Sequence, residues 1–372
     1  MKHLDESYRY LAARCIEPLL HALARQLDGS RLAEDVECVH QARVVSRRLR
    51  SALRMFGGCF PPKKFKRWRN AVRDLTRHLG EARDLDVQVL FLESCVGALG
   101  PEERRMLRPG LVRLLLRLRQ RREKTQSHVV KAIDAFERSG VLEELHAEAA
   151  STKFALERRQ PAFGSAYVYD QAAKHVDERL TELLPLQDAL ADIAAADRHH
   201  KLRIAAKRLR YTLEICDPAF DGALDAYVKH AKKLQTLLGE LHDCDVWAEQ
   251  LDAFVEEERE RTLAYFGHIR PFSVLLPGID YLRAERKSAH DQLFREAAAY
   301  WAALEGDDVW GALRRLVHAR AETAMQLEET RPDESGSETS AQVQHPDEDY
   351  ANDGSVAGGR AWEPAGPRES AE

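Results

Sequence analysis

The sequence predicts an all-α protein that contains an internal duplication. Most of the 372-residue chain has apolar residues at helical spacing, and it is rich in Ala, Leu, Glu and Arg, which are good helix formers. Alternating runs of Val, Ile, Thr and Tyr, which would predict strands, are missing. The sequence "HQARVVSRRLR" at 40–50 also returns as "HKLRIAAKRLR" at 200–210. We call these two segments the basic repeats.

Clusters of Gly and Pro divide the helical pattern and predict where the helices end. The predicted breaks are "DGS" (28–30), "GGCFPP" (57–62), "LG" (79–80), "GALGP" (97–101), "SG" (139–140), "QPAFG" (160–164), "DPAFDG" (217–222), "LG" (238–239) and "RPFSVLLPG" (270–278). They leave about ten to twelve helices with short connections.

A second motif follows each basic repeat in the same order. "LGEARDLDV" at 79–87 returns as "LGELHDCDV" at 238–246. Two motifs that recur in one order indicate the duplication of a unit of about 150 residues. The sequence therefore suggests two antiparallel four-helix bundles related by approximate two-fold symmetry, the first at about 1–158 and the second at about 162–332.

Charge is distributed unevenly along the chain. The whole sequence has 56 Lys and Arg against 61 Asp and Glu, a net charge of −5. Residues 333–372 hold ten acidic and two basic residues and are rich in Gly, Pro and Ser, which predicts a disordered acidic tail. We interpret this tail as solubilising, with competition for a basic site as the alternative. Residues 1–332 carry a net charge of only +3, so any basic site must be a local concentration of charge.

The composition also indicates where the protein resides. Six cysteines without C-x-x-C spacing predict reduced thiols. The N-terminus lacks the apolar region of a secretory signal, and no apolar run approaches the roughly 18 residues of a membrane span. We therefore expect a cytoplasmic protein that does not interact with membranes. The sequence does not indicate the oligomeric state.

Both basic repeats predict amphipathic helices whose polar face is a stripe of positive charge. The residues of these two stripes are His40, Arg43, Arg47, Arg50 and Arg54 in the first repeat and His200, Arg203, Lys207 and Arg210 in the second. The residues opposite the stripes are Ala42, Val45, Leu49, Ala52, Leu53 and Phe56, and Leu202, Ala205, Leu209, Leu213 and Cys216. One departure matters just after the repeats, where the second helix has Glu214 at the position that corresponds to Arg54.

A single-sign stripe predicts a site for an extended anion. Like charges one turn apart destabilise a helix, so a helix selected for solubility alone would include Glu between them. Three turns span roughly 15 Å, which suits several phosphates in series. The alternatives are arginines paired with acids of neighbouring helices, and His40 and His200 as capping or core residues. Arg69, Arg73, Lys229 and Lys233 either extend the anion site or belong to a solvated face.

The acidic residues of the second motif predict structural pairing. We expect each Gly to end one helix and the acids to begin the next, where they would cap it and hold arginines in place. These acids are Glu81, Asp84 and Asp86, with Glu240, Asp243 and Asp245. The alternative is a carboxylate metal site. Against it, the first copy has Arg83, which does not bind metals, at the position of His242. We therefore predict no metal and no cofactor.

The basic repeats, together with "LGEARDLDV" and "LGELHDCDV", resemble the CHAD (conserved histidine α-helical) domain over roughly residues 1–330. The resemblance implies two four-helix bundles with pseudo-two-fold symmetry around a basic central channel. It also implies binding of inorganic polyphosphate, often with targeting to polyphosphate granules, and no catalysis. The family's basic positions match His40, Arg43, Arg47, Arg50, His200, Arg203, Lys207 and Arg210. The E-x-E-x-K signature of the CYTH triphosphatase domain, which accompanies many relatives, is absent.

Three functions fit the basic repeats, and polyphosphate binding without catalysis fits best. The first alternative is a metal-dependent phosphoanhydride hydrolase with His40 or His200 as general acid, but a Gly-rich phosphate loop and a nucleophile motif are missing. The second is a single-stranded nucleic-acid binder, but aromatic residues that would stack on bases are missing from both repeats.

Overall fold

The computed structural model describes residues 5–33, 35–157 and 164–330. The predicted acidic tail and the predicted boundary between the two bundles lie outside these residues. The described residues form ten α-helices and four short 3-10 helices and contain no strand, which confirms the all-α fold class. The α-helices are α1 (Glu6–Leu32), α2 (Val36–Met55), α3 (Pro62–Ala98), α4 (Pro101–Arg138), α5 (Val141–Glu157), α6 (Ala166–Leu183), α7 (Ala196–Cys216), α8 (Asp225–Phe266), α9 (Leu276–Gly306) and α10 (Val309–Glu329).

Three predicted helix breaks are wrong. Helix α1 continues through 28–30, α3 continues through Gly80, and α8 continues through Gly239. The acids of the second motif therefore lie in the middle of helices, and they do not begin them. A single Gly costs a helix only about 1 kcal/mol, which tertiary packing can offset. At Gly29 the benefit is close packing, because a Cβ there would lie 2.4 Å from the Cys38 Sγ of α2.

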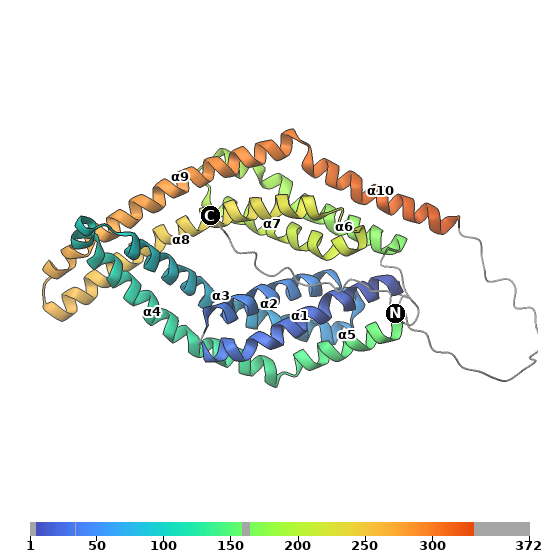
Figure 1. Cartoon of the computed structure of the whole chain (residues 1–372), viewed down its shortest axis with the longest axis horizontal. Coiled ribbons are helices and arrows are strands. Elements are labelled where there is room, and N and C mark those ends of the chain that lie inside the picture. Colours follow the sequence, from blue (N-terminus) through green and yellow to red (C-terminus); the bar gives the residue numbers. More distant parts are fainter. Residues whose placement is uncertain (1–4, 34, 158–163, 331–372) are drawn as a thin grey trace, which may run out of the picture. The chain divides into compact units, whose positions relative to one another are not determined.

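The helices pack in an order that occurs twice (Figure 1). In the first set, α1 packs against α2 and α5, α2 against α3, and α3 against α4. In the second set, α6 packs against α7 and α10, α7 against α8, and α8 against α9. The two sets meet where α2 packs against α7 and where α4 packs against α9. The helices of the two basic repeats are therefore neighbours, whereas the duplication itself stays a prediction from the sequence.

The apolar faces of both basic repeats are buried in the main core. All eleven predicted core positions are at most 9% exposed: Ala42, Val45, Leu49, Ala52, Leu53, Phe56, Leu202, Ala205, Leu209, Leu213 and Cys216. Burying one Leu or Phe side chain contributes roughly 1.5–3 kcal/mol. This burial fixes the rotation of α2 and α7, so their charged stripes lie on the opposite side from the core.

The far ends of the four longest helices, α3, α4, α8 and α9, form a second apolar core (Figure 1). Leu92, Leu111, Trp247 and Ile279 are among its buried residues. None of the described helices has an apolar stretch long enough, with few enough charges, to cross a lipid bilayer.

Helices α4 and α9 cross at two glycines. A Cβ at Gly110 would lie 2.1 Å from the Leu275 carbonyl oxygen, and a Cβ at Gly278 would lie 2.1 Å from the Leu107 carbonyl oxygen. Both clashes are with backbone, which cannot rotate out of the way. The glycines therefore allow the two helices to touch.

We predict that Gly110→Ala lowers the free energy of unfolding by about 1–3 kcal/mol, because the extra methyl group pushes the two helices apart. Gly239→Ala is the matched control. It also lies inside a helix, but nothing lies within 4 Å of its added Cβ. The control is expected to stabilise the protein by up to about 1 kcal/mol through helix propensity. Urea denaturation measures both changes, and stabilisation by Gly110→Ala would contradict the close crossing.

Candidate anion-binding site

Both histidines of the basic repeats lie near the start of a helix, as the sequence predicts. His40 is the fifth residue of α2, and His200 is the fifth residue of α7. The Asp35 side chain caps α2 by accepting a 2.8 Å hydrogen bond from the Glu37 backbone N–H. Neither histidine is a core residue, because both are partly exposed. Their buried Nδ1 atoms have no protein hydrogen-bond partner.

The two stripes meet at the buried side chain of Tyr211 on α7. The Cζ atom of Arg210 lies 4.6 Å from the centre of the Tyr211 ring. From α2, the Cζ atom of Arg47 lies 5.9 Å from the same ring centre. One aromatic ring thus holds an arginine of each basic repeat, so the two stripes form a continuous basic surface.

Glu214, which takes the place of Arg54 in the second helix, connects the two helices. Glu214 Oε2 lies 3.5 Å from Arg48 Nε of α2, and Glu214 Oε1 lies 3.6 Å from Arg210 Nη1 of its own helix. All three side chains are half-buried. An arginine at this position, corresponding to Arg54 in the first repeat, would add repulsion where α2 and α7 pack. Glu214 therefore has a structural role that explains the departure from the repeat.

Lys207 shows most clearly that the stripes share one electrostatic field. Burial, followed by the positive charges of Arg47 and Arg203, lowers the pKa of Lys207 from 10.5 to about 7. Burial also lowers the pKa of Arg47, with contributions from Arg43 and Arg210. Because Arg47 belongs to α2 and Lys207 to α7, the effect of Arg47 on Lys207 requires that the two stripes lie close together.

The basic surface continues beyond the meeting point of the stripes. Burial lowers the pKa of Arg50, and the nearby Arg54 and Arg73 lower it further. Burial likewise lowers the pKa of Arg54, with contributions from Arg208, Arg179 and Arg69. The structure thus places Arg69 and Arg73 beside the first stripe. It adds Arg179 and Arg208, which the sequence analysis did not select.

Three histidines lie at the other end of the basic surface and favour the neutral form. Burial, followed by the charge of Arg83, lowers the pKa of His40, and burial with Arg203 lowers that of His200. Burial, with Arg203 and His200, lowers the pKa of His242 to about 4. The ring centroids of His200 and His242 lie 4.3 Å apart. His242, which the sequence did not favour as a metal ligand, thus lies beside His200 at this end of the basic surface.

Ion pairs with acidic side chains account for some of the stripe cations but not for all of them. Arg43 Nη2 lies 3.0 Å from Asp84 Oδ1, and Arg210 is bound to Glu214. Among the described residues, the stripe cations that form no ion pair with a carboxylate are Arg47, Arg50, Arg54, Arg203 and Lys207. The Nε atoms of Arg203 and Arg210 are buried without a hydrogen-bond partner. Unpaired partly buried charge is costly, and an anionic ligand would remove the cost.

Lys229 and Lys233 have partners away from the stripes. Lys229 is exposed and lies 2.7 Å from Asp225, and the Lys233 Nζ lies 4.3 Å from the centre of the Tyr300 ring. Their contribution to anion binding stays a prediction. Because α8 is continuous, the 159-residue offset between the second motifs matches Arg73 with Lys232. That offset is the sequence signal that identifies Lys232, and not Lys229 or Lys233, as the counterpart of Arg73 in the second half of the chain.

Three of the four aspartates of the second motif, Asp84, Asp86 and Asp245, pair with a basic side chain among the described residues. Asp84 binds Arg43, and Asp243 lies close enough to Arg203 for that charge to oppose the rise that burial causes in its pKa. The other aspartates reach the next helix. Asp86 Oδ1 accepts a 2.6 Å hydrogen bond from Arg122 Nε of α4. Asp245 Oδ1 lies 3.2 Å from His290 Nε2 of α9. In the part of the chain that the structure describes, none of these carboxylates belongs to a group with metal-ligand spacing.

We predict that Asp86→Ala destabilises the protein by about 3–5 kcal/mol, because it leaves the largely buried Arg122 without its carboxylate. Asp84→Ala is the matched control and should cost less than about 1 kcal/mol, because Asp84 is 63% exposed. Urea denaturation with and without EDTA tests both variants. Equal losses, or a loss that disappears when EDTA is added, would contradict structural pairing.

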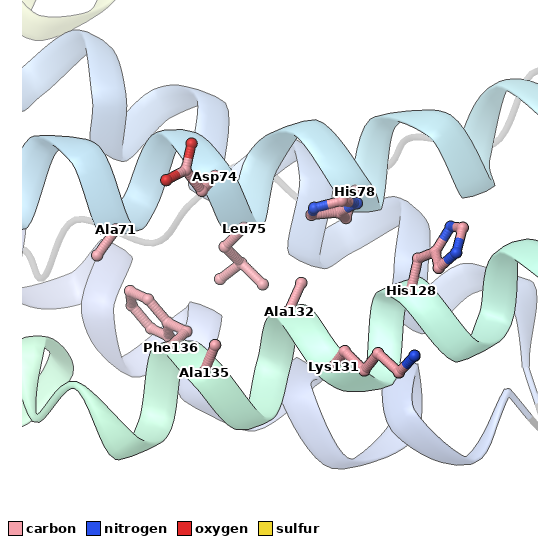
Figure 2. A pocket seen from close by; sticks show the side chains of 9 residues that line it. All are labelled: Ala71, Asp74, Leu75, His78, His128, Lys131, Ala132, Ala135 and Phe136. Atoms are coloured by element: carbon pink, nitrogen blue, oxygen red, sulfur yellow. The ribbon is translucent and has the colours of Figure 1, made fainter.

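A cavity of about 430 Å³ lies between α3 and α4, outside the stripes (Figure 2). Figure 2 shows His78, His128 and Lys131 toward one end and Phe136 and Ala71 toward the other. The stripe residues do not line it. Most of its lining side chains are apolar, so the stripes stay the candidate anion site.

Fold and site together define an all-α protein in which two basic helices lie side by side. The chain belongs to the CHAD domain family, whose model matches residues 14–252. It is 30% identical over 254 residues to uncharacterized proteins from two strains of Mycobacterium tuberculosis, CDC 1551 / Oshkosh and ATCC 25618 / H37Rv. These matches cover 63% of this chain and 45% of each relative, so the chain spans about half the length of the curated relatives it matches.

A solved structure supports the fold. The crystal structure of the CHAD domain from the plant Ricinus communis matches with a TM-score of 0.54 and 24% sequence identity. The match covers 78% of this chain and 91% of that chain. At this level of identity the likeness supports the fold alone.

Proposed function

We propose that this protein binds inorganic polyphosphate along the stripes of α2 and α7 and does not hydrolyse it. The observation that carries the proposal is the meeting of the stripes at Tyr211, beside stripe cations that have no carboxylate partner. From His40 to Arg54 the first stripe rises about 20 Å, a length suited to consecutive phosphates of one chain. Two stripes joined in this way would line the basic channel that the family resemblance implies.

The chemistry of the residues supports binding of phosphate groups. Arginine donates paired hydrogen bonds to phosphate oxygens, and lysine provides a compact charge. Neutral histidines at the end of the surface can each gain a proton when a polyanion arrives. In this proposal the protein is cytoplasmic and associates with polyphosphate granules through this surface.

Neither alternative function gains support from the site. A hydrolase would use the aspartates of the second motif on a metal, but three of the four pair with Arg43, Arg122 and His290. A single-stranded nucleic-acid binder would expose aromatic rings for base stacking. The aromatic residue at the centre of the stripes, Tyr211, is buried beneath arginines.

Parallel titrations with long-chain polyphosphate, single-stranded RNA and orthophosphate test the proposal, with phosphate release monitored in the presence and absence of Mg²⁺. We expect polyphosphate to bind much more tightly than the other two and no phosphate to be released. Metal-dependent release would favour the hydrolase. Equal affinity for RNA would favour the nucleic-acid binder.

A further inference from the structure

A second group of chemically active side chains lies on α1 and α5, which do not carry the stripes. Glu17 and His21 are four residues apart on α1 and therefore lie on one face of that helix. Helix α5 packs along α1 and contributes His146. One potential metal-ligand atom from each of these residues lies within 4.8 Å of the other two. Among the described residues, this is the one group with such spacing.

The two histidines face each other through the same ring nitrogen. His21 Nε2 and His146 Nε2 lie 3.0 Å apart, and their ring centroids lie 4.5 Å apart. Two nitrogens bound to one tetrahedral zinc ion at 2.0–2.1 Å are separated by about 3.3 Å. The observed separation is therefore within a few tenths of an ångström of the one that a shared ion requires. Without an ion, one Nε2–H donates a hydrogen bond to the other Nε2, so the two neutral rings have opposite tautomers.

The carboxylate of Glu17 completes the set of three ligands. Its Oε2 accepts a 2.9 Å hydrogen bond from Lys153 Nζ of α5, and its other oxygen remains for an ion. Lys153 then orients the carboxylate by a hydrogen bond without binding the ion itself, as residues next to the ligands do in many metal sites. Its positive charge also weakens the attraction for a dication, and this favours ions with strong affinity for imidazole.

We propose that Glu17, His21 and His146 bind one transition-metal dication, with Zn²⁺ as the best-fitting ion, and so fasten α5 to α1. Two imidazoles and one carboxylate suit Zn²⁺, Co²⁺, Ni²⁺ or Cu²⁺ far better than Mg²⁺ or Ca²⁺, which take oxygen ligands. The fourth position of a tetrahedral site is left for water. This ion holds two helices of the first set together and takes no part in the proposed polyphosphate contacts.

Titration of the tag-free, full-length protein with Co²⁺ in phosphate-free buffer tests the site, because tetrahedral Co²⁺ has a strong visible absorption. Competition with Zn²⁺ then gives the zinc affinity. We expect one equivalent to bind, and Zn²⁺ but not Mg²⁺ to raise the melting temperature. Loss of an outer partner typically weakens metal binding by 10–100-fold, so loss of a ligand in His21→Gln should weaken it by about 100-fold or more.

His268→Gln is the matched control, because His268 is also an exposed histidine but belongs to no group with metal-ligand spacing. It should bind as the wild type does. Glu17→Gln and His146→Gln provide independent losses, and circular dichroism of the metal-free proteins excludes misfolding as the cause. His21 is exposed, so His21→Gln should retain the fold. Wild-type binding in all three ligand variants, or absence of tetrahedral Co²⁺ absorption in the wild type, would overturn the proposal.

Discussion

Reversing the charges where the stripes meet, in the double variant Arg47→Glu with Lys207→Glu, should weaken polyphosphate binding by about a thousandfold. A hydrogen bond to a charged group contributes about 1.5–3 kcal/mol. Losing two such contacts removes about 4 kcal/mol, and each 1.4 kcal/mol corresponds to a factor of ten in affinity. The folded protein should survive the change, because both new carboxylates lie among unpaired cations.

Isothermal titration with long-chain polyphosphate measures this loss. Arg259→Glu with Lys287→Glu is the matched control, because it changes the net charge equally at two exposed ion pairs outside the stripes. That control should lose little affinity beyond the general effect of net charge. If both double variants weakened binding equally, polyphosphate would be responding to overall charge, and the stripes would not be its site.

Polyphosphate affinity should fall as the pH rises from about 7 to about 9. In the free protein, burial and neighbouring arginines lower the pKa of Lys207 to about 7, so Lys207 is largely neutral above that pH. A bound polyanion favours the charged form and raises this pKa. Binding above pH 7 therefore takes up a proton, and the affinity decreases by up to about one decade per pH unit.

The histidines act in the same direction at lower pH. The pKa values of His40, His200 and His242 are lowered in the free protein, so polyphosphate binding should also drive proton uptake below about pH 6.5. The affinity for polyphosphate should thus increase as the pH falls from about 9 to about 6.

Lys207→Arg separates the lysine from the histidines. Arginine stays protonated, so this variant should bind well at pH 9 and lose the alkaline fall while retaining the acidic increase. Titrations at pH 6, 7, 8 and 9 in two buffers of different ionisation enthalpy measure affinity and proton uptake together. An unchanged alkaline fall in Lys207→Arg would exclude Lys207 as its cause.

The fold class and the orientation of each stripe could be predicted from the sequence because both depend on local periodicity. Apolar positions such as Leu49 and Leu209 recur at helical spacing, and they are buried. The family resemblance implied that both stripes line one basic channel, but their contact at Tyr211 could not be predicted, because it depends on the packing of α2 against α7. Arg179 and Arg208 were missed for the same reason, since only tertiary structure brings them to Arg54.

The errors in helix boundaries have a related cause. Gly80 and Gly239 were interpreted as helix ends, but each lies inside a long helix. A Cβ at Gly80 would make only ordinary van der Waals contact, 3.4 Å from the Nε of Arg43, and nothing lies within 4 Å of a Cβ at Gly239. Sequence alone does not distinguish a glycine that ends a helix from one that lies inside it. Likewise, the group formed by His21 and His146 joins residues 125 positions apart, which no local pattern reveals.

The salt dependence of polyphosphate affinity tests the central claim most directly, namely that the stripes of α2 and α7 are the binding site. The logarithm of the affinity should fall steeply and linearly with the logarithm of salt concentration, because each phosphate contact releases a counterion. In Arg47→Gln with Lys207→Gln, the slope should become shallower by about 1.4, as expected for two lost contacts on a single-stranded polyanion. An affinity insensitive to salt, or an unchanged slope in this variant, would contradict the account.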